Sequence, residues 1–143
     1  MYRHTQIGWV TILSLGVAFL FILFLNLSPC STIGIFPAIV MFIIMLAFLT
    51  LTVTVKKDYI NMVFGIGIFR MRIKTNEIVS SVIVRNRWWY GFGIHGWWGK
   101  GWLVNVSGLD AVELKMKNGM VYRVGSDEPQ KLNEAIQAEI KQA

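Results

Sequence analysis

Residues 85–102 read RNRWWYGFGIHGWWGKGW and combine cations, aromatic rings and glycines in one short stretch. Five of the six tryptophans and five of the thirteen glycines of the chain fall here. Glycine-rich turns cradle phosphates, aromatic rings beside cations stack on nucleic-acid bases, and tryptophans with basic neighbours lie at lipid surfaces. A fourth alternative is structural, in which the glycines turn the corners of a small β-barrel and the rings fill it.

The glycines of residues 91–96, GFGIHG, match the GxGxxG spacing of the dinucleotide fingerprint. That fingerprint needs a helix to begin at the glycines, so that its amide dipoles face the pyrophosphate, and residues 97–101, WWGKG, are not a helix start. The Gly-Lys pair within them resembles part of a P-loop, but Ile94 and Gly101 stand where that motif needs Gly and Ser or Thr. We expect no nucleotide cofactor.

No constellation of catalytic residues can be recognised. The two histidines, His4 and His95, have no Cys, His or Asp neighbour at metal-ligand spacing. Ser107 lies in a predicted turn, with no histidine placed to activate it. The sequence therefore predicts no catalytic residue, no metal site and no cofactor, and it favours a binding protein over an enzyme.

The apolar content is high for a chain of 143 residues: 55% of the residues are hydrophobic and the mean hydropathy is +0.53. Residues 5–55 contain no charged residue and no histidine, and they hold two apolar blocks, at about 7–27 and 33–55. Crossing a bilayer takes about 20 residues of helix, so each block is long enough. Residues 1–55 are therefore predicted to form a transmembrane helical hairpin, with a tight loop at 28–32.

Basic residues flank the two blocks on one side only. Arg3 precedes the first block, Lys56 and Lys57 follow the second, and the loop between them has no cation. The positive-inside rule then predicts a multi-pass protein of the bacterial cell inner membrane with both termini in the cytoplasm. Residues 56–143 carry all the acidic residues and are predicted to form the water-exposed domain.

Short strands dominate this second part. In residues 68–74 the apolar Phe69, Met71 and Ile73 alternate with cations, which indicates a half-buried strand. Residues 111–117 alternate in the same way, and Asn118-Gly119 then separates them from the strand-like residues 120–124, as in a β-hairpin. Weaker strand patterns occur at 59–64, 78–84, 92–94 and 102–106. With the three strands already described, the expected total is about seven.

The end of the chain changes to helical periodicity. Asp127 and Gln130 stand at capping-box spacing around Glu128-Pro129, and apolar residues then recur on one face. An amphipathic helix is expected at about 128–141, packed on the strands.

Three segments resemble the small bacterial membrane-anchored proteins with a pleckstrin-homology-like (PH-like) domain: WYGFGI at 89–94, GWLVNVSGLDAVEL at 101–114, and YRVGSDEP at 122–129 followed by Leu132. The resemblance covers the domain at 56–143, and the two-span anchor before it is similar too. It implies an α+β PH-like domain: a small antiparallel β-barrel or sandwich of about seven strands, capped by the C-terminal helix. It also implies binding through loops or a groove beside that helix.

The positive charge lies in the first half of the domain, where residues 56–100 hold eight basic and two acidic residues. Close to a bilayer, such cations and tryptophans meet anionic headgroups in preference to nucleic acid. The predicted lipid- or partner-binding residues are Lys56, Lys57, Arg70, Arg72, Lys74, Arg85, Arg87, Trp88, Trp89, Trp97, Trp98 and Lys100.

The function expected from these features is a non-catalytic, membrane-anchored PH-like interaction module. It would bind or scaffold proteins, or bind anionic lipid headgroups, at the cytoplasmic membrane face. Its partners would be membrane lipids and other membrane proteins or further copies of itself, without nucleic acid. The alternative is an accessory subunit of a larger membrane enzyme or transport complex, in which the apolar helices pack on a partner's helices.

Overall fold

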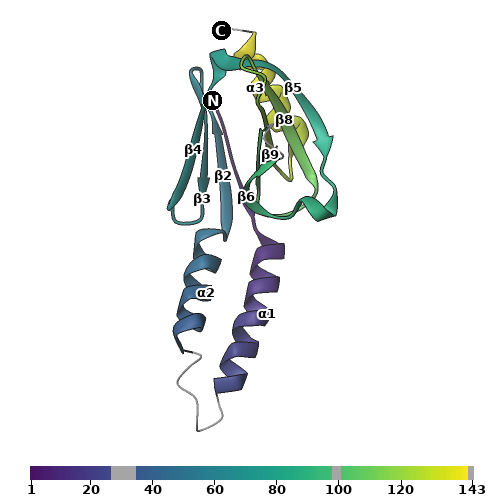
Figure 1. Ribbon diagram of the computed structural model, residues 1–143. Helices are drawn as coiled ribbons and strands as arrows, with labels where there is room; N and C mark the ends of the chain where they lie inside the picture. The colour runs from purple at the N-terminus through teal and green to yellow at the C-terminus, as the bar shows by residue number, and fades with distance from the viewer. Residues whose placement is uncertain (27–34, 98–100, 142–143) are drawn as a thin grey trace.

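The computed structural model describes residues 1–26, 35–97 and 101–141. Figure 1 shows two β-sheets and a helix gathered at one end of the molecule and a pair of helices extending from the other end. The extending helices are α1 (Trp9–Asn26) and α2 (Ile35–Ala47). The chain is thus an α+β protein whose paired helices project away from its sheets, and they are called the hairpin below.

The first sheet has four antiparallel strands in the order β1-β2-β3-β4. Alternate residues of its central strands are buried, such as Leu51 and Val53 of β2 and Ile60 and Met62 of β3. This period of two is that of a sheet with one face in the core and one face in water. Its strands are β1 (Tyr2–Ile7), β2 (Thr50–Val55), β3 (Tyr59–Phe64) and β4 (Phe69–Lys74).

The second sheet has the order β5-β8-β9-β7-β6 and contains one parallel pair, β7 with β9. Its other pairs are antiparallel. Short 3-10 turns, η1 (Thr75–Glu77) and η2 (Trp88–Tyr90), precede and follow β5. The strands are β5 (Ile78–Arg85), β6 (Gly93–Trp97), β7 (Gly101–Asn105), β8 (Asp110–Met116) and β9 (Val121–Gly125).

The two sheets and the C-terminal helix share one hydrophobic core. Helix α3 (Pro129–Ile140) contributes Leu132 and Ile136, both fully buried among side chains of both sheets. The helix therefore closes the space between the sheets.

The Ser126 hydroxyl accepts a hydrogen bond of 3.1 Å from the amide of Glu128, the residue just before the helix, and Pro129 is the first helical residue. No side chain in the described ranges caps the helix start, so the capping box expected from Asp127 and Gln130 does not form.

Several local predictions are confirmed. The β4 cations are exposed while Ile73 is buried. Asn118-Gly119 forms the turn between β8 and β9, with Gly119 at φ +82° and its amide donating to the Met116 carbonyl. Helix α3 lies within the expected range. Phe69 lies on the same face of β4 as Ile73, as expected, but it is exposed at the end of the strand, where it stacks on Phe48 with ring centroids 5.5 Å apart.

The expected fold class is contradicted. Among the described residues, no helix is long and apolar enough to cross a membrane, so the predicted two-span transmembrane hairpin at 7–27 and 33–55 is wrong. Helix α1 has 18 residues and α2 has 13. At 1.5 Å per residue they are about 27 and 20 Å long, against roughly 30 Å of hydrocarbon in a bilayer. The loop expected at 28–32 lies outside the described residues.

The helices are shorter than the uncharged run because strands take both of its ends. The run of residues 5–55 begins inside β1 and ends with β2, which pair with each other over their full length. Residues 50–55, TLTVTV, alternate threonine with buried leucine and valine, a strand pattern that a hydropathy average treats as part of an apolar block.

Two further expectations fall with the transmembrane hairpin. The predicted membrane and transmembrane character, and the multi-pass location in a bacterial inner membrane with both termini in the cytoplasm, are contradicted by the same finding on helix length. The expected antiparallel barrel or sandwich is corrected in part. Residues 56–143 do contain seven strands, β3 to β9, but β1 and β2 from the predicted transmembrane part join them in two sheets, and the β7–β9 pair is parallel.

Two glycines join the hairpin closely to the sheets. The Gly8 amide, between β1 and α1, donates a hydrogen bond of 2.8 Å to the Leu49 carbonyl. Gly65, at φ +48° in the β3–β4 turn, lies so close to the end of α2 that a Cβ atom there would be 2.2 Å from the Leu46 carbonyl oxygen. Because both contacts involve backbone atoms, the hairpin has a defined orientation relative to the sheets.

A cross-strand ion pair supports the second sheet. Arg123 of β9 contacts Glu113 of β8 through Nε and Nη2, each 2.8 Å from Oε2, and its Nη1 donates to the buried Asn86 at 3.3 Å. We expect Arg123→Met to lower the free energy of unfolding by about 2 kcal/mol, since a half-buried carboxylate then loses its partner. Urea unfolding measures this. Lys115→Met, at an exposed position of β8, is the control, and equal midpoints for the two variants would show that the pair contributes nothing.

Candidate functional site

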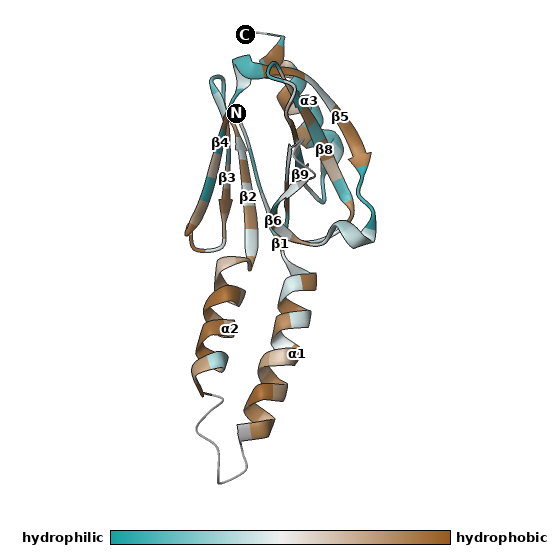
Figure 2. Cartoon of the chain, viewed as in Figure 1, coloured by the Kyte–Doolittle hydropathy of each residue, from teal (hydrophilic) through white to brown (hydrophobic). Residues whose placement is uncertain are grey.

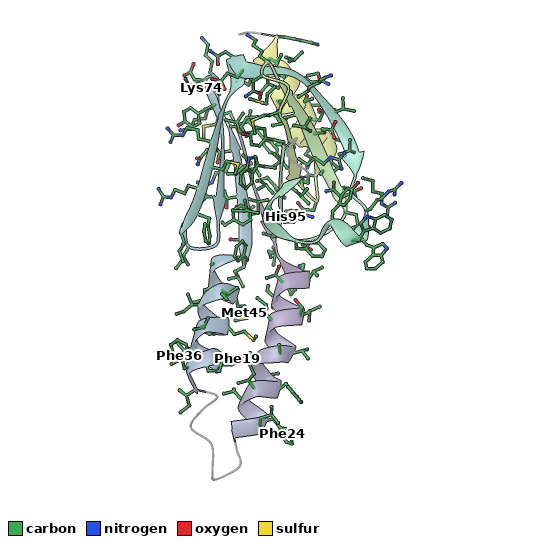
Figure 3. The ribbon with its side chains drawn as sticks, viewed as in Figure 1. Phe19, Phe24, Phe36, Met45, Lys74 and His95 are labelled. Carbon is green, nitrogen blue, oxygen red and sulfur yellow. The ribbon has the colours of Figure 1, made fainter. Side chains whose placement is uncertain are left out.

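Each helix of the hairpin exposes apolar side chains over more than half of its circumference. On α2 the consecutive residues Phe42, Ile43 and Ile44 are all exposed, and three consecutive helical positions span about 200°. Figure 2 shows both helices coloured mainly as hydrophobic, and Figure 3 shows Phe24 and Phe36 pointing outward from them. The exposed large apolar residues of the hairpin are Trp9, Val10, Leu13, Val17, Leu20, Phe21, Leu23, Phe24, Leu25, Ile35, Phe36, Ile39, Val40, Phe42, Ile43 and Ile44.

Contacts within the hairpin cover only a small part of this surface. Phe19 of α1 and Phe42 of α2 approach with ring centroids 6.0 Å apart, and Ala38 and Ala47 are the buried residues of α2. A helix that is apolar all round is stable only when it is surrounded by apolar material. An apolar surface of this extent on a protein marks an interaction site.

A second group of exposed apolar residues surrounds the base of the hairpin and is called the basal belt: Trp9, Ile66, Ile68, Phe69, Trp88, Trp89 and Phe92. Three elements supply it: the first turn of α1, the β3–β4 turn that contacts the end of α2, and the segment between β5 and β6. Figure 1 shows the last of these at the end of the sheets that faces the hairpin. Phe92 lines a hollow of about 360 Å³ together with Val10 and Phe48. The belt therefore marks the level at which the hairpin leaves the sheets.

Within the belt, Trp88 and Trp89 form an edge-to-face pair with centroids 5.7 Å apart. The Arg87 guanidinium lies 5.1 Å from the centre of the Trp89 ring. Trp88 is 75% exposed and Trp89 is 57% exposed, so neither ring belongs to the core. The glycines of the same stretch serve its backbone: Gly91 and Gly93 have φ of +74° and +107°, a left-handed region that other residues rarely adopt.

The cations predicted as binding residues divide between two places. Arg70, Arg72 and Lys74 extend from β4 on the outer face of the first sheet, together with Lys56 at the end of β2. Arg85 is instead the last residue of β5, an edge strand of the second sheet, and Arg87, Trp88 and Trp89 lie on the segment that follows it. Lys57 is exposed in the β2–β3 turn and Trp97 is the last residue of β6, while Trp98 and Lys100 lie outside the described residues.

The outer face of the first sheet contains a hollow of about 460 Å³. Arg3, Lys56 and Arg70 line it, with Thr54 and Asn61 between them. Strand register places Arg3, Thr54, Asn61 and Arg72 side by side in one row across all four strands. Tyr59 carries two cations over its ring, with Arg72 Cζ at 4.4 Å and Lys56 Nζ at 5.5 Å from its centre.

Sequence reasoning did not include Arg3, Tyr59 or Asn61 in the site. Arg3 belongs to β1, a strand whose sequence YRHTQI lacks the apolar alternation that predicts strands. Tyr59 and Asn61 do alternate with the buried Ile60 and Met62 of β3, so their outward direction was a usable signal. Only the pairing of β1 with β2 brings Arg3 to them.

The potentially catalytic side chains have structural partners. His4 Nε2 lies 2.6 Å from Asp127 Oδ1 and His4 Nδ1 lies 3.5 Å from Glu128 Oε2, a link from β1 to the start of α3. His95 Nε2 contacts the Tyr90 carbonyl. Burial raises the pKa of the nearby Tyr2 phenol, and the negative charges of Glu128 and Asp127 raise it further. No group of three or more metal-ligating side chains occurs in the described part of the chain.

No protein-family model, no curated protein and no solved structure matches the chain. The fold and the exposed surfaces define it as a small α+β protein with an apolar helical hairpin, a belt of aromatic and aliphatic residues at the base of that hairpin, and a cationic sheet face.

Proposed function

We propose that this protein is a non-catalytic interaction module whose partner is a lipid surface. The hairpin enters the apolar part of the lipid layer from one side, the basal belt lies at the level of the headgroups, and the two sheets remain in water. Neither helix needs to cross the layer. The observation that carries the proposal is the exposure of large apolar side chains over more than half of the circumference of α1 and α2, with no charged residue on either helix.

Lipid fits this surface better than a second copy of the chain does. A helix partner covers one stripe of a helix, whereas fluid hydrocarbon covers the whole circumference. Tryptophan prefers the boundary between hydrocarbon and water, where Trp9, Trp88 and Trp89 of the belt would lie. Arg87, beside Trp89, supplies a cation at the same level, and one cation near an anionic lipid surface contributes about 1 kcal/mol.

The resemblance to PH-like domains forms part of the proposal. Two sheets with a common core and a C-terminal helix that closes it support this resemblance, and the parallel β7–β9 pair departs from it. A domain of this kind held at a lipid surface would bind or scaffold other proteins there.

Vesicle flotation with hydrogen exchange tests the proposal. The full chain is diluted from non-ionic detergent into phosphatidylcholine vesicles, with or without phosphatidylglycerol. We expect it to float with both, and more completely with the anionic vesicles at low salt. Backbone amides of α1 and α2 should also gain protection, while those of α3 should not change. If the chain stays at the bottom of the gradient, lipid is not the partner. Protection of the hairpin by a stoichiometric companion protein instead of lipid would also exclude lipid, and it would favour an accessory subunit.

A further inference from the structure

The hollow on the outer face of the first sheet has the charge of an anion-binding site. Arg3, Lys56 and Arg70 line it, and no Asp or Glu is among its lining residues. None of these three cations forms an ion pair with a carboxylate in the described ranges, although Arg70 Nε does donate to the Gly67 carbonyl at 3.1 Å. Positive charge without a partner of opposite sign attracts anions from solution.

The neutral side chains between the cations are hydrogen-bond donors. Thr52, Thr54 and Asn61 extend into the same hollow from the two central strands. Hydroxyl and amide donors beside arginine match the several acceptor oxygens of a phosphate group. Arg3 and Arg70 line the hollow from the two edge strands, β1 and β4, which are three strand spacings or about 14 Å apart, so their long side chains can reach toward one ligand between them.

The size of the hollow suits a small molecule. Its volume of about 460 Å³ is in the range of small-ligand sites, which is roughly 300–1,000 Å³. Its lining is mixed: Tyr59, Val63 and Ile66 supply apolar surface beside the polar groups. Buried aromatic anchors dominate most protein interfaces, and a protein partner bound to this face by charge alone would lack them.

The position of the hollow separates a soluble ligand from a lipid headgroup. It extends along the strands from Gly65, beside the end of α2, to Lys56 and Tyr59 at the opposite end of the sheet. At 3.3 Å per residue this is about 20 Å. The headgroup layer on each side of a bilayer is only about 6 Å thick, so it reaches Arg70 but not Arg3 or Lys56. This step rests on the proposed function, which places the headgroups at the basal belt.

We propose that the outer face of the first sheet is a binding site for a soluble, phosphate-bearing small molecule. Arg3 and Lys56 bind its phosphate oxygens in the part of the hollow farthest from the hairpin, and Thr54 and Asn61 donate hydrogen bonds to the same ligand. Arg70 extends the site toward the hairpin. The protein would then bind a soluble anion while its hairpin contacts a lipid surface.

Calorimetric titration of the full chain in non-ionic detergent with inorganic pyrophosphate tests the site. We expect saturable binding to the wild-type chain and at least tenfold weaker binding to the double variant Arg3→Gln and Lys56→Gln. The matched control is Lys115→Gln with Lys117→Gln, which removes the same charge from exposed positions near the end of β8 and should bind pyrophosphate as the wild type does. Thermal unfolding of both variants checks that they remain folded.

Three results would overturn the site. The first is the absence of saturable pyrophosphate binding, and the second is an equal loss in the two double variants, which would indicate attraction by net charge only. The third is a loss of phosphatidylglycerol-vesicle binding in Arg3→Gln with Lys56→Gln as large as the loss of pyrophosphate binding, which would assign the cations to lipid headgroups. Binding of the wild-type chain to phosphatidylcholine vesicles is a separate readout, so the site can fail while the proposed function stands.

Discussion

Replacing Val17 and Leu20 with aspartate is expected to reduce binding of the chain to phosphatidylcholine vesicles by at least about a thousandfold. Both side chains are exposed in the middle of α1, at 67% and 64%. An aspartate at the centre of a helix in hydrocarbon costs about 3 kcal/mol, and each 1.4 kcal/mol is a factor of ten in affinity. Two substitutions therefore cost about 6 kcal/mol, which is more than the roughly 4 kcal/mol of a thousandfold change, even when lipid and water rearrange around them. Flotation over a series of lipid concentrations measures the change.

The matched control for this variant is Val79→Asp with Val82→Asp. Both valines are 56% exposed on β5, so the control adds the same charge at a surface that the proposal leaves in water. It should bind vesicles like the wild-type chain. Equal binding of the hairpin variant and the wild type would mean that the exposed apolar surface of α1 does not contact lipid.

The substitution Gly101→Ala is expected to lower the free energy of unfolding by about 3 kcal/mol or to prevent folding. A Cβ atom at Gly101 would lie 1.7 Å from the Val121 carbonyl oxygen, in the parallel pair of β7 with β9. Backbone cannot move aside as a flexible side chain can, so the strands must separate and lose hydrogen bonds, and overpacking of this kind costs about 1–3 kcal/mol or more. Urea unfolding followed by circular dichroism gives the value.

Gly16→Ala provides the same chemical change at an open position. Apart from the adjacent residues and the backbone of its own helix, no atom of the described residues lies within 4 Å of a Cβ placed at Gly16, which is in the interior of α1. Alanine favours a helix over glycine by about 1 kcal/mol, so this variant should be as stable as the wild type or more stable. If Gly101→Ala unfolds at the same urea concentration as Gly16→Ala, the close approach of β7 to β9 is not needed for the fold.

The sequence was most informative where polar and apolar residues alternate clearly. β3, β4, β8 and β9, the Asn118-Gly119 turn and α3 all follow from local periodicity and turn chemistry. β2 shows the opposite case. Its alternation of threonine with valine is a strand pattern, but it lies next to an apolar helix, and no charge separates the two. An average over some twenty residues merges strand and helix into one span.

The candidate site was predictable in composition but not in arrangement. The cations of β4 are close in sequence to Arg85 and Arg87, yet Arg85 belongs to the second sheet and Arg87 follows that strand. Arg3 is distant in sequence from the β4 cations and lies in one row with Arg72, because β1 and β2 pair across the whole hairpin. Strand order is a long-range property, and residue spacing does not carry it.

Ile7 and Thr50, which lie on either side of the hairpin in the sequence, are paired in adjacent strands of the first sheet. The polypeptide departs from the sheet and returns to it at neighbouring positions, which is the geometry that an ordinary two-residue β-turn provides. Forty-odd residues thus connect two neighbouring strands that a tight turn could also connect. The strand order of the sheet does not depend on them. The hairpin is therefore an insertion between two paired strands, and a shorter or different insertion would leave the strand arrangement of the sheets unchanged.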